Sequence, residues 1–274
     1  MGKTKIEWTD YTFNPWVGCH KISEGCANCY AERQMTRNTT WSNTWGPEVL
    51  TQRIPTADSN WRKPVRWNTQ AKAQGKPLFV FSGSLCDIFE EHRDVTDSRS
   101  RLIELIDSTP HLIWLLLTKR PENVNDMVPP HWRMVPPENL WIGTSVENQK
   151  NAVNRLRHFR HINAVVKFVS YEPAIGPVSW SGWEPYLQWM IFGGESGARS
   201  RDANSRWAIM AKNWCERNGI PFFMKQMGTA WAVEMQMSKQ YPKGENFDAF
   251  PKELQVREVP EVVYQPKGSV AGLS

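Results

Sequence analysis

Three of the five cysteines in this 274-residue chain lie within eleven residues, at Cys19, Cys26 and Cys29. The stretch reads VGCHKISEGCANCYAE, with six residues between the first two cysteines and two residues between the last two. An odd number of cysteines in a chain of this length does not suggest a disulfide framework. Such a cluster is expected to bind a metal or to do chemistry.

Three kinds of site are compatible with these thiols. A structural zinc site needs four ligands, and His20 beside Cys19 is the nearest candidate for the fourth. A redox dithiol formed by Cys26 and Cys29 would leave Cys19 without a role. An iron–sulfur cluster is held by thiolates, and three cysteines on a four-iron cluster leave one iron open for another molecule.

The elements that must position these thiols are indicated by short apolar runs after residue 77. Six runs rich in β-branched or aromatic residues predict buried strands: PLFVFSGSLCD, HLIWLLLTKR, LWIGTSVEN, VKFVSYEP, LQWMIFGGES and IPFFMKQMG. Helical patterns lie between several of them, over Thr96–Ser108, Asn148–His161 and Asn204–Asn218. Alternating strands and helices predict a parallel sheet.

Some local features of these helices also follow from the sequence. We expect Val153, Leu156 and Phe159 to form the buried face of the second helix, and Gly219 to follow the end of the third. In the third helix, the expected buried stripe is Trp207, Met210 or Ala211, and Trp214. Residues 30–77 look irregular apart from a short helix after Cys29.

Polar side chains follow every one of the predicted strands. In a parallel barrel all these ends meet on the face where active sites lie, whereas an open sheet gathers only those at its switch point. We therefore predict an α/β fold, a partial (β/α) barrel with mostly parallel strands. The strand-end residues are Ser82, Ser84, Asp87, Thr118, Lys119, Arg120, Ser145, Glu147, Ser170, Glu172, Gly193, Gly194, Glu195, Lys225 and Gln226.

The net charge of +5 is concentrated near the amino terminus. Residues 1–72 contain ten Lys/Arg and six Asp/Glu, a net of +4, together with six of the fifteen tryptophans. Basic residues interleaved with aromatic ones can follow a nucleic-acid backbone and stack on bases. A mildly basic segment whose tryptophans are buried explains the same composition.

The sequence contains no signal for a membrane. No run of about 18 apolar residues is present, and MGKTKIEWTD lacks the apolar core of a secretory signal. We therefore expect a cytoplasmic protein without a membrane partner.

The cysteine stretch resembles the cluster loop of radical S-adenosylmethionine (SAM) enzymes. In that superfamily three cysteines, commonly spaced C-x3-C-x2-C, hold a [4Fe–4S] cluster whose open iron binds the methionyl part of SAM. One electron then cleaves the sulfonium to give a 5′-deoxyadenosyl radical. The C-x2-C half matches this pattern, while the longer gap after Cys19 and the aromatic Tyr30 behind the last cysteine depart from it.

The wider chain is similar to the phage gene product 37/gene product 68 family, three-cysteine proteins with radical-SAM-like features and an undefined reaction. The motifs that carry the resemblance are FNPWVGCHKISEGCANCYAE, LTKRPE, WIGTSVENQ, VSYEPAIGPV, FGGESG and PFFMKQMG, over about residues 5–230. It implies a radical-SAM-type barrel over residues 1–230, with an irregular insertion at 30–77. An extension packed on the barrel follows at 231–274.

The resemblance also implies cofactors and partners, and the strand ends supply the other expected site residues. It implies a [4Fe–4S] cluster on the three cysteines, SAM, an electron donor such as flavodoxin or ferredoxin, and room for a separate partner protein. The expected substrate is a nucleobase or nucleotide. The alternatives are a non-catalytic zinc-binding nucleic-acid-binding protein and a barrel that keeps its cluster as structure only. Expected catalytic residues are Lys119, Glu147 and Lys225, and expected cofactor contacts are Tyr30, Ser84, Asp87, Ser145, Glu172, Gly193, Gly194 and Glu195.

Overall fold

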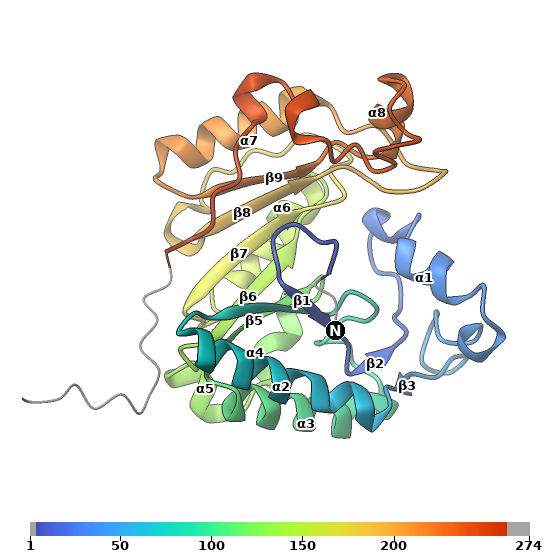
Figure 1. The fold of residues 1–274 in the computed structure, drawn as a ribbon, viewed down its shortest axis with the longest axis vertical. Coiled ribbons are helices and arrows are strands. Elements are labelled where there is room, and N and C mark those ends of the chain that lie inside the picture. Colours follow the sequence, from blue (N-terminus) through green and yellow to red (C-terminus); the bar gives the residue numbers. More distant parts are fainter. Residues whose placement is uncertain (1–3, 262–274) are drawn as a thin grey trace, which may run out of the picture.

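A curled sheet of seven parallel strands forms the centre of the computed structural model, which describes residues 4–261 (Figure 1). Every neighbouring pair of strands is parallel, and the sheet curls into a half-barrel with β1 and β9 at its open edges (Figure 1). Its order is β1 (Tyr11–Phe13), β4 (Leu78–Ser82), β5 (Leu112–Thr118), β6 (Leu140–Ser145), β7 (Val166–Tyr171), β8 (Trp189–Gly193) and β9 (Phe222–Gln226). The predicted α/β class and partial parallel barrel are confirmed, and the six apolar runs are β4 to β9.

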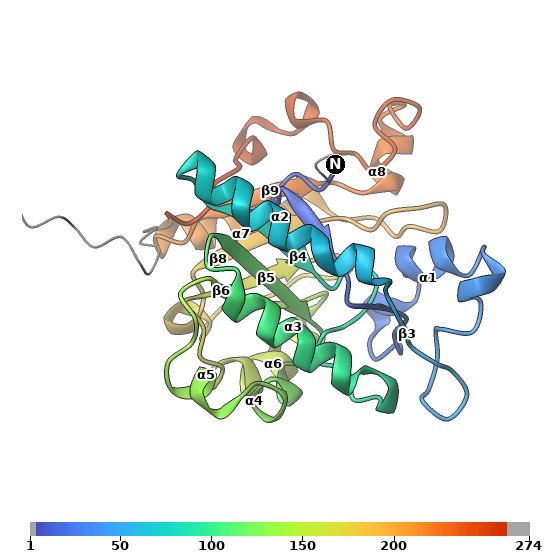
Figure 2. The same cartoon turned by 60° about the horizontal axis from the view of Figure 1, so that its bottom comes forward.

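Helices cover the convex face of the sheet (Figures 1 and 2). The long ones are α2 (Asp58–Gln74), α3 (Thr96–Ser108), α6 (Gln149–Phe159) and α7 (Ser205–Arg217). Shorter helices are α1 (Tyr30–Met35), α4 (Val124–Met127), α5 (Pro130–Met134) and α8 (Thr229–Glu234). A separate antiparallel pair, β2 (Trp16–Val17) and β3 (Ile54–Pro55), flanks the segment that contains the three cysteines and α1.

Helices α6 and α7 have the expected positions, but α6 buries a different face, whereas α7 buries the expected stripe through Ala211 and Trp214. In α6 the side chain of Val153 is 53% exposed and Arg155 is buried, so the expected face is wrong there. Arg155 turns inward because it pairs with the buried Glu147. In α7, Met210 is exposed and Ala211 is buried.

Residues 30–77 are not irregular throughout, contrary to expectation. Seventeen of them form α2, whose buried residues Trp61, Pro64, Trp67 and Ala71 recur at spacings of three and four. A proline and two tryptophans on that face hide the helical period in the sequence. The helix ends at Gly75, which has the left-handed conformation that glycine adopts without strain.

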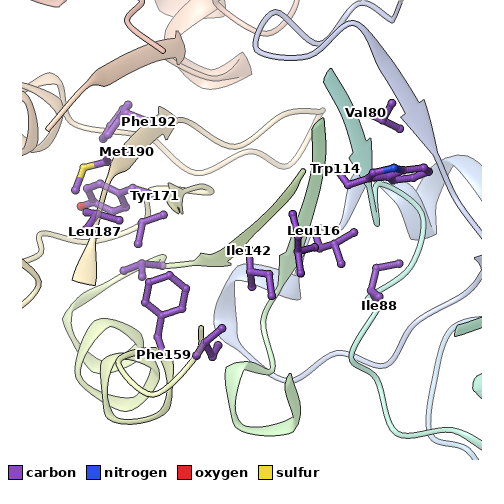
Figure 3. Close-up of a cluster of buried hydrophobic side chains, with 14 of the residues drawn as sticks. Val80, Ile88, Trp114, Leu116, Ile142, Phe159, Tyr171, Leu187, Met190 and Phe192 are labelled. Atoms are coloured by element: carbon purple, nitrogen blue, oxygen red, sulfur yellow. The ribbon is translucent and has the colours of Figure 1, made fainter. Parts of the chain in front are cut away.

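Alternate strand residues point outward into the core beneath the helices (Figure 3). Trp114 and Leu116 of β5, Ile142 of β6 and Phe159 of α6 are all almost fully buried there. Full burial of one such apolar side chain contributes about 1.5–3 kcal/mol. This core therefore fixes the sheet against its helices.

The other alternate residues point into the half-barrel, where a second apolar cluster fills the lower interior. Trp8, from the segment before β1, lies among them. Its ring centroid is 4.6 Å from that of Phe81 and 6.1 Å from that of Trp189. A closed barrel fills its interior with strand side chains alone. Because this sheet stays open between β1 and β9, a side chain from outside it completes the packing.

Most of the amino-terminal tryptophans are core residues. Trp41 and Trp45 are partly exposed, so base stacking stays open for these two. Trp16, Trp61 and Trp67 are buried beneath the helices and are unable to stack on bases from solution, and Trp8 is buried on the inner side of the sheet.

The carboxy-terminal segment packs on the same core. Phe250 and Leu254 are buried in the core between the sheet and its helices, and Arg257 forms an isolated antiparallel β-bridge with Phe223 of β9. Residues 262–274 of the predicted extension lie outside the described part of the chain. Among residues 4–261, no helix combines the length and the apolar character that a membrane crossing requires.

We expect Trp8→Ala to lower the free energy of unfolding by about 3–5 kcal/mol, because it removes the side chain that completes the inner cluster. Urea denaturation of the purified protein measures this loss. Trp41→Ala removes a partly exposed tryptophan and should cost clearly less. Equal losses for the two variants would contradict the role of Trp8.

Candidate functional site

A cavity of about 1100 Å³ opens at the carboxyl ends of the strands. Inward-facing positions change from large to small or polar as each strand approaches this end. Three pairs show the change: Phe81 is followed by Gly83, Phe168 by Ser170, and Phe223 by Lys225. The aromatic residues form the floor, and the space above them lies on the face where parallel barrels carry their active sites.

The segment from Gly18 to Cys29, here called the cysteine loop, forms one wall of the cavity. Cys19, Cys26 and Cys29 all line it. The loop begins at Gly18, whose φ of +120° and close approach to the Thr44 carbonyl exclude a side chain. Its backbone N–H donates to the Leu85 carbonyl at 3.1 Å, which ties the loop to the chain after β4.

A buried carboxylate, Glu147 after β6, holds the middle of the loop. It pairs with Lys119 at 3.0 Å and with Arg155, and it accepts a hydrogen bond from the Ser23 hydroxyl at 3.0 Å. Gly25 lies so close to this carboxylate that a Cβ would collide with it. Burial alone would raise the pKa of Glu147, but Lys119 and Arg155 together lower it below its ordinary value.

Arg120, after β5, holds the beginning of the loop. Its guanidinium donates to the His20 carbonyl at 2.7 Å and lies 3.8 Å from Cys19 Sγ. It also pairs with Asp87 at 2.9 Å and lies 3.6 Å from Glu90, which in turn pairs with the buried Arg53. This chain of buried charges connects the loop to the segment that precedes β3.

Glu195, after β8, holds the end of the loop. Asn28 donates to its carboxylate at 3.0 Å, and Arg201 pairs with the same group at 2.5 Å. Beyond the last cysteine, Tyr30 donates its hydroxyl hydrogen to the Ser84 carbonyl at 2.9 Å. The cysteine loop is thus anchored on the chain after β4, β5, β6 and β8.

The glycines of FGGESG provide room for neighbouring groups. A Cβ on Gly193 would lie 2.8 Å from the Glu172 carboxyl carbon, and one on Gly194 would collide with the Met227 carbonyl. Gly197, with φ of +110°, lies against the Arg33 guanidinium, which donates to the Ser196 carbonyl at 3.3 Å. Close packing therefore accounts for each glycine in this motif.

A second ion pair lies across the cavity. Lys225 of β9 pairs with Glu172 at 2.5 Å, and Ser170 donates to the other carboxylate oxygen at 3.4 Å. Both partners line the cavity and are only partly buried. Unlike Glu147, this carboxylate remains accessible to a bound molecule.

The donor types around the loop fit a thiolate-bound group. Three thiols share one cavity wall, and the positive charges of Arg120 and Lys119 act on Cys19 and Cys29 respectively. Burial raises the pKa of both thiols, so each must lose a proton to become a ligand. Across residues 4–261, no three His, Cys, Asp or Glu side chains converge tightly enough to hold a metal ion.

Most of the sequence-predicted site residues lie on this cavity. Glu147 and Gly193 do not line it: Glu147 is fully buried with its oxygens engaged, and Gly193 lies beside Glu172. His20, the fourth ligand of the zinc alternative, is exposed on the wall. The predicted residues on the wall are Cys19, Cys26, Cys29, Tyr30, Ser84, Asp87, Lys119, Ser145, Glu172, Gly194, Glu195 and Lys225.

Sequence reasoning missed three residues that shape the site: Trp8, Asn28 and Arg155. Arg155 has a sequence signal, because a carboxylate expected to be buried after a strand needs a cation, and this arginine lies eight residues beyond Glu147. Asn28 and Trp8 have no comparable signal, since their partners come from distant segments.

Comparison with known families finds that the model of DUF5131, a protein of unknown function, matches residues 3–253. No curated protein and no solved structure matches the chain.

Glu147→Gln should lower the free energy of unfolding by about 3–5 kcal/mol, because it leaves Arg155 buried without its charge partner. Glu24→Gln is the control in the same loop, since Glu24 pairs with Lys150 on the exposed surface and should cost at most about 1 kcal/mol. Urea denaturation at neutral pH separates the two. A similar small loss for both would refute the anchoring role of Glu147.

The stability that Glu147 contributes should also depend on pH. Its pKa in the folded protein is below the ordinary value of 4.5, so its contribution is present above that value and disappears as the pH falls through the folded pKa. Urea titrations between neutral and acidic pH should show wild type losing more stability on acidification than Glu147→Gln. Parallel pH profiles would contradict the pairing.

Proposed function

We propose that this chain, which belongs to the DUF5131 family, is a radical-SAM-type iron–sulfur enzyme that acts on a nucleobase or nucleotide. The observation that carries the proposal is the shared position of Cys19, Cys26 and Cys29 on one wall of a polar cavity, at the carboxyl ends of a parallel half-barrel. A structural zinc site alone would not call for a large cavity lined by strand-end polar groups.

The three cysteines are the proposed ligands of a [4Fe–4S] cluster. When bound, such a cluster supplies the single electron that cleaves the sulfonium of SAM. The chain's own contribution is to fix the loop: Glu147 holds Ser23, and Arg120 holds the His20 carbonyl. Arg120 and Lys119 also place positive charge beside ligands that become anionic thiolates.

The remaining wall residues differ in how free they are to bind SAM. Asp87 is committed to Arg120, to the Thr118 hydroxyl and to the Lys119 N–H, so its role is to hold the loop after β5. Ser84 and Glu172 are better placed for ligand contact. Ser84 accepts from Asn14 at 2.8 Å and keeps its hydroxyl hydrogen to donate.

The Glu172–Lys225 pair is proposed to bind hydroxyl groups of the cofactor or substrate. The Glu172 carboxylate lies beside Lys225 on the cavity wall, where it can accept hydrogen bonds from ribose hydroxyls. Lys225 in turn presents ammonium hydrogens that Glu172 does not use. We therefore assign both residues to binding. A role in proton transfer would require a substrate atom within hydrogen-bond distance of one of them.

Anaerobic purification followed by iron and sulfide analysis should find a cluster, and SAM with dithionite should then yield 5′-deoxyadenosine. Cys26→Ala should abolish the brown chromophore and the product. Cys215→Ala is the matched control, because Cys215 is buried in α7, away from the cavity, and should leave both unchanged.

Two outcomes would count against the proposal. One equivalent of zinc with no iron would favour a zinc-binding protein, with His20 as the nearest fourth ligand. An intact cluster that cleaves no SAM, even with nucleotides and oligonucleotides present, would leave the cluster as structure only.

A further inference from the structure

The cavity is at the upper end of the size range of ligand pockets. Such pockets usually measure roughly 300–1,000 Å³, and this one measures about 1100 Å³. Its wall extends from the cysteine loop to Lys5 and Trp8 before β1 and to Lys243 after α8. Part of the wall is therefore formed by segments that do not belong to the cysteine loop.

The charges that line the cavity fall into two groups. Three of its four carboxylates have their own cations: Asp87 has Arg120, Glu172 has Lys225 and Glu195 has Arg201. The fourth carboxylate is the exposed Glu7. Four cations on the wall have no carboxylate partner among residues 4–261, namely Lys5, Arg33, Arg37 and Lys243.

These four cations come from three separate segments around the opening. Lys5 precedes β1, Arg33 and Arg37 belong to α1 and the turn after it, and Lys243 follows α8. The side chains of Lys5, Arg37 and Lys243 are exposed. Helices α1 and α8 lie at the same end of the molecule in both views (Figures 1 and 2). SAM carries one carboxylate and two positive charges, so these cations fit a more strongly anionic ligand.

The cavity floor offers an unused hydroxyl group next to aromatic rings. Trp8 is 4% exposed and lines the cavity beside Phe81. Thr12 also lines the cavity, and its hydroxyl makes no hydrogen bond to residues 4–261. A ligand with acceptor atoms in a flat ring is well suited to this floor, because it can pack on the rings and accept a hydrogen bond from the hydroxyl.

From these observations we propose that the cavity binds one nucleotide unit with its base inward, over Trp8 and Thr12, and its phosphates at the mouth. Lys5, Arg33, Arg37 and Lys243 bind the phosphates. The inference deepens the proposed function by assigning its substrate subsite, while binding itself requires neither the cluster nor SAM. A strand of nucleic acid and a free nucleotide share this chemistry.

Fluorescence anisotropy of a labelled single-stranded oligonucleotide with the full-length protein tests whether the cations at the cavity mouth bind phosphates. Replacing Lys5, Arg37 and Lys243 by Ala should weaken binding and reduce the slope of log affinity against log salt by about 2, since each lost phosphate contact on a single strand is worth about 0.7. The charge-matched control replaces Arg62, Arg66 and Lys72, exposed residues of α2 away from the cavity. Its affinity and slope should stay at the wild-type values.

An abasic strand of the same length tests whether the cavity floor binds a base. Wild type should bind it about tenfold more weakly than the base-containing strand, and Thr12→Val should reduce that difference because it keeps the side-chain shape but removes the hydroxyl. Competition by a nucleoside monophosphate at similar concentrations would identify a free nucleotide as the source. Competition by oligomers alone would identify a strand.

Equal weakening by the mouth and α2 replacements would overturn the proposal, because it would show nonspecific attraction to a basic protein. Equal affinity for abasic and base-containing strands would overturn the base subsite. These binding results are separable from the proposed chemistry, because they are read on protein with or without iron. Wild-type protein that forms no cluster but binds the oligonucleotide as expected would mark a failure of the proposed function alone.

Discussion

The burial of one carboxylate is the constraint on which the arrangement of the site depends. Glu147 is inaccessible to solvent, and an isolated charge there would be prohibitively unfavourable. Lys119 from the next strand end and Arg155 from α6 compensate it, and the Ser23 hydroxyl adds a hydrogen bond. The same group thus fixes a helix, a strand end and the cysteine loop. The position of the middle of the cysteine loop therefore depends on a carboxylate that these two cations allow to be buried.

The open edge of the sheet sets a second condition. Seven strands do not close a barrel, so the interior would be exposed between β1 and β9. Trp8 covers the lower part, where the inward-facing residues are large, and the upper part remains a cavity because the inward-facing residues there are small or polar. The cysteine loop then forms a wall that a closed barrel would build from strand ends. A half-barrel gains a wide opening in this way without losing its apolar floor.

Much of this arrangement could be predicted from sequence, for physical reasons that differ between elements. The six strands after residue 77 are short, apolar and rich in β-branched or aromatic residues, so their type is local information. Their order in a parallel sheet then places Ser84, Lys119, Glu172 and Lys225 at one end without further knowledge. That step needs only the rule that parallel strands share a direction.

The features that escaped prediction depend on contacts between distant segments. The buried face of α6 includes Arg155 because Arg155 pairs with the buried Glu147. A pattern of apolar residues does not predict a buried arginine. Helix α2 hides its period behind Pro64 and two tryptophans. In the sequence, Trp8 is one of several aromatic residues in a basic segment. Its position in the inner cluster depends on the sheet being open between β1 and β9, which the sequence pattern does not show.

The division of charge in the cavity connects these features to ligand binding. Carboxylates deep in the cavity are each matched by a cation, since an unmatched charge would be costly where water is scarce. Cations at the mouth need no such partner, because water solvates them until an anion arrives. An unpaired positive charge is therefore inexpensive at the rim and is attractive to an anion over a distance of about 8–10 Å at moderate salt. Selection for binding an anionic ligand can act on the rim without disturbing the paired groups that hold the cysteine loop.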